Sequence, residues 1–409
     1  MTESIETVVI GGGQAGLAVS FHLKERRREH VVFERARVAE RWRTQRWDSL
    51  RFQFPNWTVE LPGFAYSGDD PHGFLHKDAV VRFIEDYAVR IQAPLRTGVN
   101  VESLMADKRT GGYVVRTDHG DMNARNVVIA TGPYQRPRVP QISAAFPTDV
   151  VQLHASEYHN PDELPAGSVL VIGSGASGCQ IADELVEGGR RVFLSVGRHR
   201  RFPRRYRGQD FLHWWRALGR ADRIVDDSPD ARFGGEPSVI TGVHGGYDID
   251  LRRSAANGLR LLGHLVNVSD GRAALAPDLE ETLSASDEAF DAFRREVDAY
   301  VSRTGIDAPL QQGDHRPADT TEASGSPDAI DFRAEAIRSV IWATGYALDL
   351  GWVELPVFDE LRYPVHRRGV TAASGIYFLG LPWLYKATSA FLSGVGEDAS
   401  FIADRITES

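Results

Sequence analysis

Two stretches of the chain share one order of apolar and polar positions. An apolar run at 7–10 enters Gly-Gly-Gly-Gln-Ala-Gly at 11–16, and apolar residues then recur at helical spacing over 17–23. The same order returns as an apolar run at 168–172, Gly-Ser-Gly-Ala-Ser-Gly at 173–178 and a helical pattern to 185. A strand, a tight turn and a helix are the elements of a dinucleotide-binding unit, so the sequence predicts two such units.

Each unit also ends in a second matching signal. An apolar run enters Ala-Thr-Gly at 130–132 after the first unit and again at 343–345 after the second. The second unit is longer by about 50 residues, which fall between Arg200 and Asp331. In both units we therefore expect a buried strand, after which the chain crosses over at the glycine.

The extra segment contains one helical pattern and one polar stretch. Phe290, Phe293, Val297 and Tyr300 recur at helical spacing, which predicts an amphipathic helix that covers the site. Residues 311–328 hold Gly, Pro, Ser, Thr and Asp with almost no apolar residues. Burial of so few apolar side chains cannot offset the conformational entropy lost when the segment becomes ordered. We predict a mobile surface loop there.

The first glycine turn has the context that a dinucleotide site needs. Gly11 allows the tight turn, Gly13 lets the backbone approach a pyrophosphate, and Gly16 permits close helix packing. The helix N-terminus offers unpaired N–H groups to the phosphates. Glu34 ends the next apolar run at the distance expected of a ribose-binding carboxylate. A dinucleotide with free ribose hydroxyls fits this unit.

The second unit lacks such an acid. Its corresponding strand ends at Ser195 and runs into a basic cluster at 198–201. An arginine can hold a ribose 2′-phosphate by charge-assisted hydrogen bonds, so the sequence favours NADPH over NADH, with Arg198 as the main contact. The alternative is a solvated basic loop.

Charge and cysteine content narrow the class further. The formal net charge of −9 opposes attraction to nucleic acid or to anionic membranes, so we expect a small-molecule partner. Cys179 is the single cysteine, which excludes the two-cysteine disulfide reductases and favours an inert buried thiol. The chain shows no signal peptide or membrane-spanning run, so a cytoplasmic location is the default expectation. A homodimer is left open.

With these motifs the chain resembles the class B flavoprotein monooxygenases, which include flavin-containing monooxygenases, Baeyer-Villiger enzymes and plant YUCCA proteins. The resemblance spans nearly the whole chain. Besides both glycine turns, it rests on Arg41-Trp42-Arg43, Trp47-Asp48-Ser49-Leu50-Arg51, His154 with Tyr158, Ala343-Thr344-Gly345-Tyr346 and Phe391-Leu392-Ser393-Gly394-Val395-Gly396.

The resemblance implies that FAD occupies the first unit and that NADPH reduces it. Oxygen then forms a C4a-hydroperoxyflavin, which inserts one oxygen atom into a small organic substrate. Because such a peroxide decays in water, dry surroundings matter more than an acid-base pair, so neither a catalytic triad nor a metal is expected. Nitrogen, sulfur or activated-carbon oxygenation is favoured; Baeyer-Villiger insertion and an NADPH-dependent flavoprotein reductase with a protein acceptor are the alternatives.

The predicted fold is α/β, with two Rossmann-like dinucleotide-binding domains and the NADPH domain inserted in the FAD domain. Residues 1–153 form the first part of the FAD-binding domain, 154–335 the NADPH-binding domain with a helical and loop insertion, and 336–409 the C-terminal part of the FAD-binding domain.

Three residues are the catalytic candidates. Gln53 stands where the resemblance implies an asparagine beside the flavin, and the alternative is a buried packing glutamine. His154 and Tyr158 are the surviving half of a fingerprint between the domains, in which Thr148 and Val150 replace phenylalanine and glycine. The alternative for His154 is a hinge histidine that ties the two domains together.

The predicted cofactor-binding residues come from both glycine turns, the strand ends and the motifs that carry the resemblance. They are Gly11, Gly13, Gln14, Ala15, Gly16, Glu34, Arg35, Arg41, Trp42, Arg43, Trp47, Ser49, Val101, Ala130, Thr131, Gly132, Gly173, Ser174, Gly175, Ala176, Ser177, Gly178, Ser195, Arg198, Ala343, Thr344, Gly345 and Leu392. Trp214, Trp215, Trp383 and Tyr385 are further candidates for lining substrate space.

Overall fold

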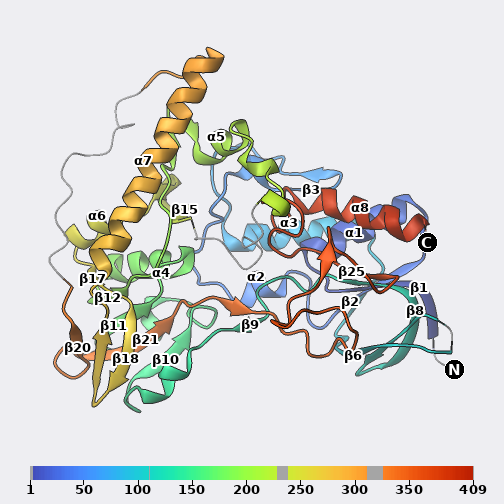
Figure 1. Cartoon of the computed structure of the whole chain (residues 1–409), viewed down its shortest axis with the longest axis horizontal. Helices are drawn as coiled ribbons and strands as arrows, with labels where there is room; N and C mark the ends of the chain where they lie inside the picture. Colours follow the sequence, from blue (N-terminus) through green and yellow to red (C-terminus); the bar gives the residue numbers. More distant parts are fainter. Residues whose placement is uncertain (1–2, 110, 228–237, 311–325, 409) are drawn as a thin grey trace.

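The computed structural model describes residues 3–109, 111–227, 238–310 and 326–408 (Figure 1). Two sheets, each with helices packed on it, lie side by side and are joined by crossing segments (Figure 1). The predicted α/β class is confirmed. Most of the loop predicted at 311–328 lies outside the described residues.

The first sheet is assembled from both ends of the chain. Its strands are β1 (Glu3–Ile10), β2 (His30–Glu34), β5 (Leu95–Thr97), β6 (Val101–Ala106), β7 (Tyr113–Thr117), β8 (Gly120–Ile129), β23 (His366–Arg367), β24 (Val370–Thr371) and β25 (Ile376–Phe378). The order β25-β8-β1-β2-β5 is parallel throughout. The C-terminal segment therefore completes a sheet that the N-terminus begins.

The second sheet is wholly parallel, in the order β10-β21-β11-β12-β17. Its strands are β10 (Val151–His154), β11 (Ser168–Ile172), β12 (Val192–Ser195), β17 (Arg260–Leu262) and β21 (Ile337–Trp342). The domain boundaries at 153/154 and 335/336 stay a prediction. They would cut β10 and leave β21 outside the sheet in which both strands pair.

The remaining elements connect or cover the sheets. The helices are α1 (Gln14–Glu25), α2 (Glu40–Thr44), α3 (Lys77–Arg90), α4 (Ala176–Glu187), α5 (Phe211–Ala217), α6 (Leu251–Ala256), α7 (Leu279–Thr304) and α8 (Val395–Glu408). The short strands are β3 (Glu60–Leu61), β4 (Phe64–Ala65), β9 (Arg136–Pro137), β13 (Arg205–Tyr206), β14 (Gln209–Asp210), β15 (Ile240–Thr241), β16 (Tyr247–Asp248), β18 (Leu265–Ser269), β19 (Arg272–Leu275), β20 (Ala329–Asp331) and β22 (Tyr346–Ala347). Within the described ranges no helix combines the length and apolar character needed to cross a bilayer.

The predicted amphipathic helix exists as α7, which runs along the outside of the second unit (Figure 1). Phe290, Phe293 and Val297 are buried along one stripe, as the spacing predicts, and Tyr300 packs against the same cluster. α7 thus buries the apolar side of the segment that lengthens the second unit.

Candidate functional site

The first glycine turn is shaped by contacts that only glycine permits. Gly11 has φ +113°, and a Cβ there would lie 2.5 Å from the carbonyl oxygen of Ala130. A Cβ on Gly16 would lie 1.9 Å from the carbonyl oxygen of Gly11. These glycines let α1 and the end of β8 approach the turn closely.

Gly13 differs from its neighbours because its missing side chain faces open space. It is the N-cap of α1, with φ −88° and ψ −170°, and no heavy atom lies within 4 Å of the position that a Cβ would take. Among the described residues, no side-chain hydrogen bond caps this end of the helix. The N-terminus of α1 therefore faces the cleft with donors available to an anion.

Glu34 closes the turn from the end of β2. Its Oε2 accepts from Gly12 N at 2.8 Å and its Oε1 accepts from Ala36 N at 3.0 Å. Its carboxylate is thus held at the mouth of the turn, next to the position of Gly13, where it lines the cleft.

The second turn repeats this geometry. Gly173 has φ +105°, and a Cβ there would lie 2.6 Å from Ala343 O; a Cβ on Gly178 would lie 1.9 Å from Gly173 O. Gly173 N donates to Ser195 O at 3.0 Å, as Gly11 N donates to Phe33 O at 2.8 Å. Ser195 is therefore equivalent to Phe33, and buried Val196 stands where the first unit has Glu34.

Ser195 and Ser174 use their hydroxyl groups inside the protein. Ser195 Oγ donates to Gly263 O and accepts from Leu265 N, whereas Ser174 Oγ donates to Gly197 O at 2.7 Å. Neither hydroxyl faces the cleft, so both brace the turn and the strand end around it.

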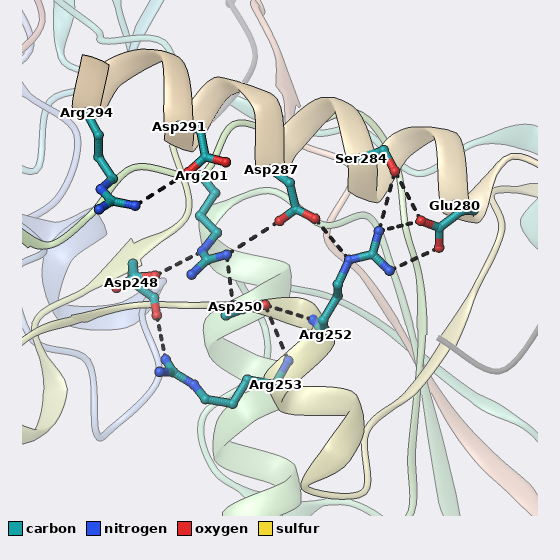
Figure 2. Close-up of polar contacts among 10 residues, drawn as sticks. All are labelled: Arg201, Asp248, Asp250, Arg252, Arg253, Glu280, Ser284, Asp287, Asp291 and Arg294. Carbon is teal, nitrogen blue, oxygen red and sulfur yellow. Dashed lines mark hydrogen bonds and ion pairs between the residues drawn. The ribbon is translucent and has the colours of Figure 1, made fainter. Parts of the chain in front are cut away.

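The basic cluster after β12 divides into bound and exposed arginines. Arg201 is buried against three carboxylates, with ion pairs of 2.9 Å to Asp248, 2.9 Å to Asp250 and 3.5 Å to Asp287 (Figure 2). Asp287 belongs to α7 and also binds Arg252 (Figure 2). Arg201 is thus occupied in anchoring α7, while Arg198 and Arg200 are exposed and Arg200 lines the cleft described below.

A cleft of about 1060 Å³ is lined by residues of both units. The first turn and the N-terminal residues Ala176 and Ser177 of α4 both line it. The predicted site residues along its wall are Gly11, Gly13, Gln14, Ala15, Glu34, Arg35, Arg41, Trp42, Trp47, Gln53, Val101, Ala130, Thr131, Gly132, Ala176, Ser177 and Leu392. Most of the predicted flavin side is therefore brought together.

The other predicted site residues lie behind that wall or beside it. They are Gly16, Arg43, Ser49, His154, Tyr158, Gly173, Ser174, Gly175, Gly178, Ser195, Arg198, Ala343, Thr344 and Gly345. Arg43 points instead to α3, where it forms an ion pair with Glu85.

His154 holds the connection between the two sheets. It is 2% exposed, its Nε2 donates to Gly345 O at 3.1 Å, and its Nδ1 accepts from Ser156 N at 3.1 Å. Burial lowers the pKa of His154, so the ring is neutral. Its edge packs against the ring of Tyr346, with centroids 4.9 Å apart, and Tyr346 lines the cleft.

Tyr158 and Ser49 converge on Glu184 of α4. The Tyr158 hydroxyl donates at 3.3 Å and the Ser49 hydroxyl donates at 2.8 Å to the two carboxylate oxygens. Burial raises the pKa of Glu184. This cluster fastens the 47–51 segment of the first unit to the second unit.

Gln53 lines the cleft, and its side-chain amide has no hydrogen-bond partner among the described residues. Its backbone carbonyl is held by Arg204 Nη1 at 2.6 Å. The amide is therefore available to a ligand while the backbone that carries it is fixed.

An aromatic wall completes the cleft and was largely missed from the sequence. Phe54, Phe202, Phe211 and Phe391 line it together with Trp215. Phe54 packs on Phe391 with ring centroids 5.1 Å apart, and Trp215 stacks on Phe391 at 6.3 Å. These residues come from four separate segments, so no spacing rule could have grouped them.

The predicted tryptophans divide between this wall and the core. Trp215 and Trp383 line the cleft, and Trp383 does so with φ +51°, a backbone conformation that bulky residues rarely adopt. Trp214 is fully buried, and its indole N–H donates to Tyr206 O at 2.7 Å. Tyr385 does not line the cleft, and contact of Trp215 and Trp383 with substrate stays a prediction.

No residue of α7 lines the cleft, so the prediction that this helix covers the site is wrong. Phe293 of α7 packs behind the wall, with ring centroids 5.3 Å from Phe202 and 5.4 Å from Phe211. The helix supports the aromatic wall from outside.

Two phosphate-binding turns that share one cleft define a class of α/β oxidoreductases that bind two dinucleotides. Residues 8–214 match the family described as pyridine nucleotide-disulphide oxidoreductase. The chain belongs to this family. It has a single cysteine, Cys179, which is buried, and burial raises the pKa of its thiol.

The relatives refine this assignment. An "uncharacterized oxidoreductase CzcO-like" of Geobacillus kaustophilus is 32% identical over 99% of both chains. "Indole-3-pyruvate monooxygenase YUCCA1" of Oryza sativa subsp. japonica is 32% identical over 46% of this chain and 47% of that protein.

Solved structures share the fold over the whole chain. A flavin-containing monooxygenase from Stenotrophomonas maltophilia superposes with a TM-score of 0.68 at 20% identity, covering 100% of this chain and 99% of that one. A structure titled OTEMO in complex with FAD and NADP gives 0.56 at 15% identity, covering 100% and 86%. The predicted resemblance to class B flavoprotein monooxygenases is confirmed.

Proposed function

We propose that this protein is an FAD-dependent NADPH monooxygenase that transfers one oxygen atom from O2 to a small organic substrate. The observation that carries the proposal is the cleft, in which the first glycine turn, the N-terminus of α4 and an aromatic wall face one another. A flavin and a hydride donor bound at the two turns would meet beside a water-poor surface.

The first turn fits FAD. The space left open at Gly13 and the uncapped N-terminus of α1 suit a pyrophosphate, and Glu34 is placed to accept from ribose hydroxyls. Trp42 and Trp47 line the cleft farther along, where we assign the flavin ring.

The second turn fits NADPH by the same reasoning. Ala176 and Ser177 start α4 at the cleft and would face the pyrophosphate. Val196 replaces the ribose-binding acid, which removes the acceptor that NADH would use. Arg198 remains our first candidate for the 2′-phosphate and Arg200, which is also exposed and lines the cleft, is the second, whereas Arg201 is engaged with carboxylates.

Bound FAD would supply hydride acceptance from NADPH and the activation of O2. The chain's own residues would supply dryness and orientation. Phe54, Phe391 and Trp215 exclude water from the substrate end, Gln53 presents an uncommitted amide there, and His154 acts from behind by holding Gly345 and Tyr346 in place.

The test begins with purified protein and uses no assumed substrate. The protein should be yellow, and NADPH should bleach its flavin without oxygen and consume oxygen when air is admitted, with no added protein acceptor. A flavin that stays oxidised under anaerobic NADPH would exclude the proposal. Bleaching without oxygen uptake would favour a reductase that needs a partner.

The site of oxygen insertion needs a second measurement. Mass spectrometry with ¹⁸O₂ over amines, sulfides, ketones and aromatic acids should show one labelled atom in the product. We favour nitrogen, sulfur or activated-carbon oxygenation; a labelled ester from a ketone would establish Baeyer-Villiger activity instead.

A further inference from the structure

The backbone that carries Gln53 is held by a guanidinium from the other unit. Arg204 is 2% exposed, and its Nη1 donates to the Gln53 carbonyl oxygen at 2.6 Å. Because the neighbouring Phe52 N donates to Leu75 O at 2.6 Å, this short segment is fixed on both sides. The Gln53 amide stays without a partner among the described residues.

The same guanidinium is linked to the aromatic wall through Asp210. Arg204 Nη2 lies 2.8 Å from Asp210 Oδ2, and Asp210 Oδ1 accepts from Leu212 N at 2.9 Å, which caps the start of α5. Phe211, Leu212 and Trp215 of this helix line the cleft. One ion pair therefore joins the Gln53 backbone to the first turn of the helix that presents the aromatic wall.

Close packing leaves this guanidinium little freedom. Its central carbon lies 4.3 Å from the centroid of the Phe74 ring. A Cβ added to Gly246 would lie 2.5 Å from the Phe74 ring and 3.3 Å from Arg204 Nε. A Cβ added to Gly242 would lie 2.3 Å from Phe52 O. The loop at 242–246, which follows β15 in the second unit, thus packs tightly against Arg204 and Phe74.

We propose that Arg204 is a positioning residue, which sets the Gln53 amide relative to the aromatic wall through the Gln53 carbonyl and Asp210. This inference rests on the proposed function, since it concerns where Gln53 stands beside a flavin. Lysine at this position would keep the charge but would lack the planar fork that reaches two acceptors at once.

The experiment compares Arg204→Lys with Arg205→Lys as the matched control. Arg205 also donates to backbone carbonyls, those of Gly245 and Gly246, but it does not contact Gln53. Two readouts are taken on FAD-loaded protein: the visible absorption bands of the oxidised flavin, and the rate at which the NADPH-reduced protein releases hydrogen peroxide in air.

Arg204→Lys should shift the flavin bands and raise peroxide release by about tenfold, because a displacement of about 1 Å in a reaction site can cost up to a hundredfold. Arg205→Lys should leave both unchanged. Gln53→Ala should reproduce the effects of Arg204→Lys, and the double variant should be no worse than Gln53→Ala alone, as expected when one residue acts through the other.

Additive effects in the double variant, or an Arg204→Lys protein that matches the control, would overturn the inference. If Arg204→Lys does not fold, Asp210→Asn takes its place, since asparagine keeps the helix cap while it weakens the ion pair. A wild-type flavin that NADPH does not reduce would refute the proposed function, whereas the absorption bands would still decide the position of Gln53.

Discussion

Replacing Gly13 by alanine should weaken FAD binding without harming the fold. Gly13 already has φ −88° and ψ −170°, a conformation open to alanine, and its added methyl group would meet no protein atom within 4 Å. Restricting the unfolded chain at such a position stabilises a protein by about 0.4–1 kcal/mol. Because alanine is less favourable than glycine at a helix N-cap, this gain is offset, and the stability of the FAD-free variant should stay within about 1 kcal/mol of wild type.

The cost appears only when the ligand binds. If the pyrophosphate lies against the Gly13 backbone, the methyl group occupies its space, and overpacking of this kind costs about 1–3 kcal/mol. At about 1.4 kcal/mol for each factor of ten, FAD should bind roughly 5- to 150-fold more weakly. Gly16→Ala is the contrasting variant, because its Cβ would lie 1.9 Å from Gly11 O and should destabilise even the FAD-free protein.

Urea unfolding of FAD-stripped protein measures the first quantity, and titration with FAD followed by flavin fluorescence measures the second. Wild-type FAD affinity in Gly13→Ala would refute the assignment of the pyrophosphate to this turn. A loss of stability as large as that of Gly16→Ala would refute the open space seen at Gly13.

Three further predictions test the second unit and the connection. Arg198→Ala should lower the preference for NADPH over NADH in anaerobic flavin reduction, and unchanged selectivity would remove this residue from the 2′-phosphate site. Burial lowers the pKa of His154 below its ordinary 6.5, so the free energy of unfolding falls as the pH drops from 6.5 toward the folded-state pKa. Between pH 7.5 and pH 5.5 in urea unfolding, His154→Gln should therefore lose less of its free energy of unfolding than wild type. Equal losses would contradict this. Cys179 should resist thiol reagents in the folded protein and react fully in urea, because its thiol is buried and its pKa is raised; rapid modification of the folded chain would contradict the observed packing.

The catalytic candidates show how far sequence reasoning reaches. Gln53 lines the cleft, and the sequence could single it out because it follows a motif on one continuous segment; its place beside a flavin stays a prediction. His154 could be read as a hinge or as a catalytic group, and the structure puts both of its ring nitrogens in hydrogen bonds within the protein, which favours the hinge. The partners that decide this, Ser156 and Gly345, include one residue far away in the chain.

The sequence by itself determined the two strand-turn-helix units, the glycine turns and the amphipathic helix, because backbone sterics and hydrophobic periodicity act over a few residues. The tertiary structure alone decided that β10 pairs with β21 at the edge of the second sheet, that α7 supports the aromatic wall without lining the cleft, and that Arg201 is occupied by carboxylates. These outcomes depend on contacts between distant segments, where packing and charge pairing choose among partners that local patterns leave equivalent.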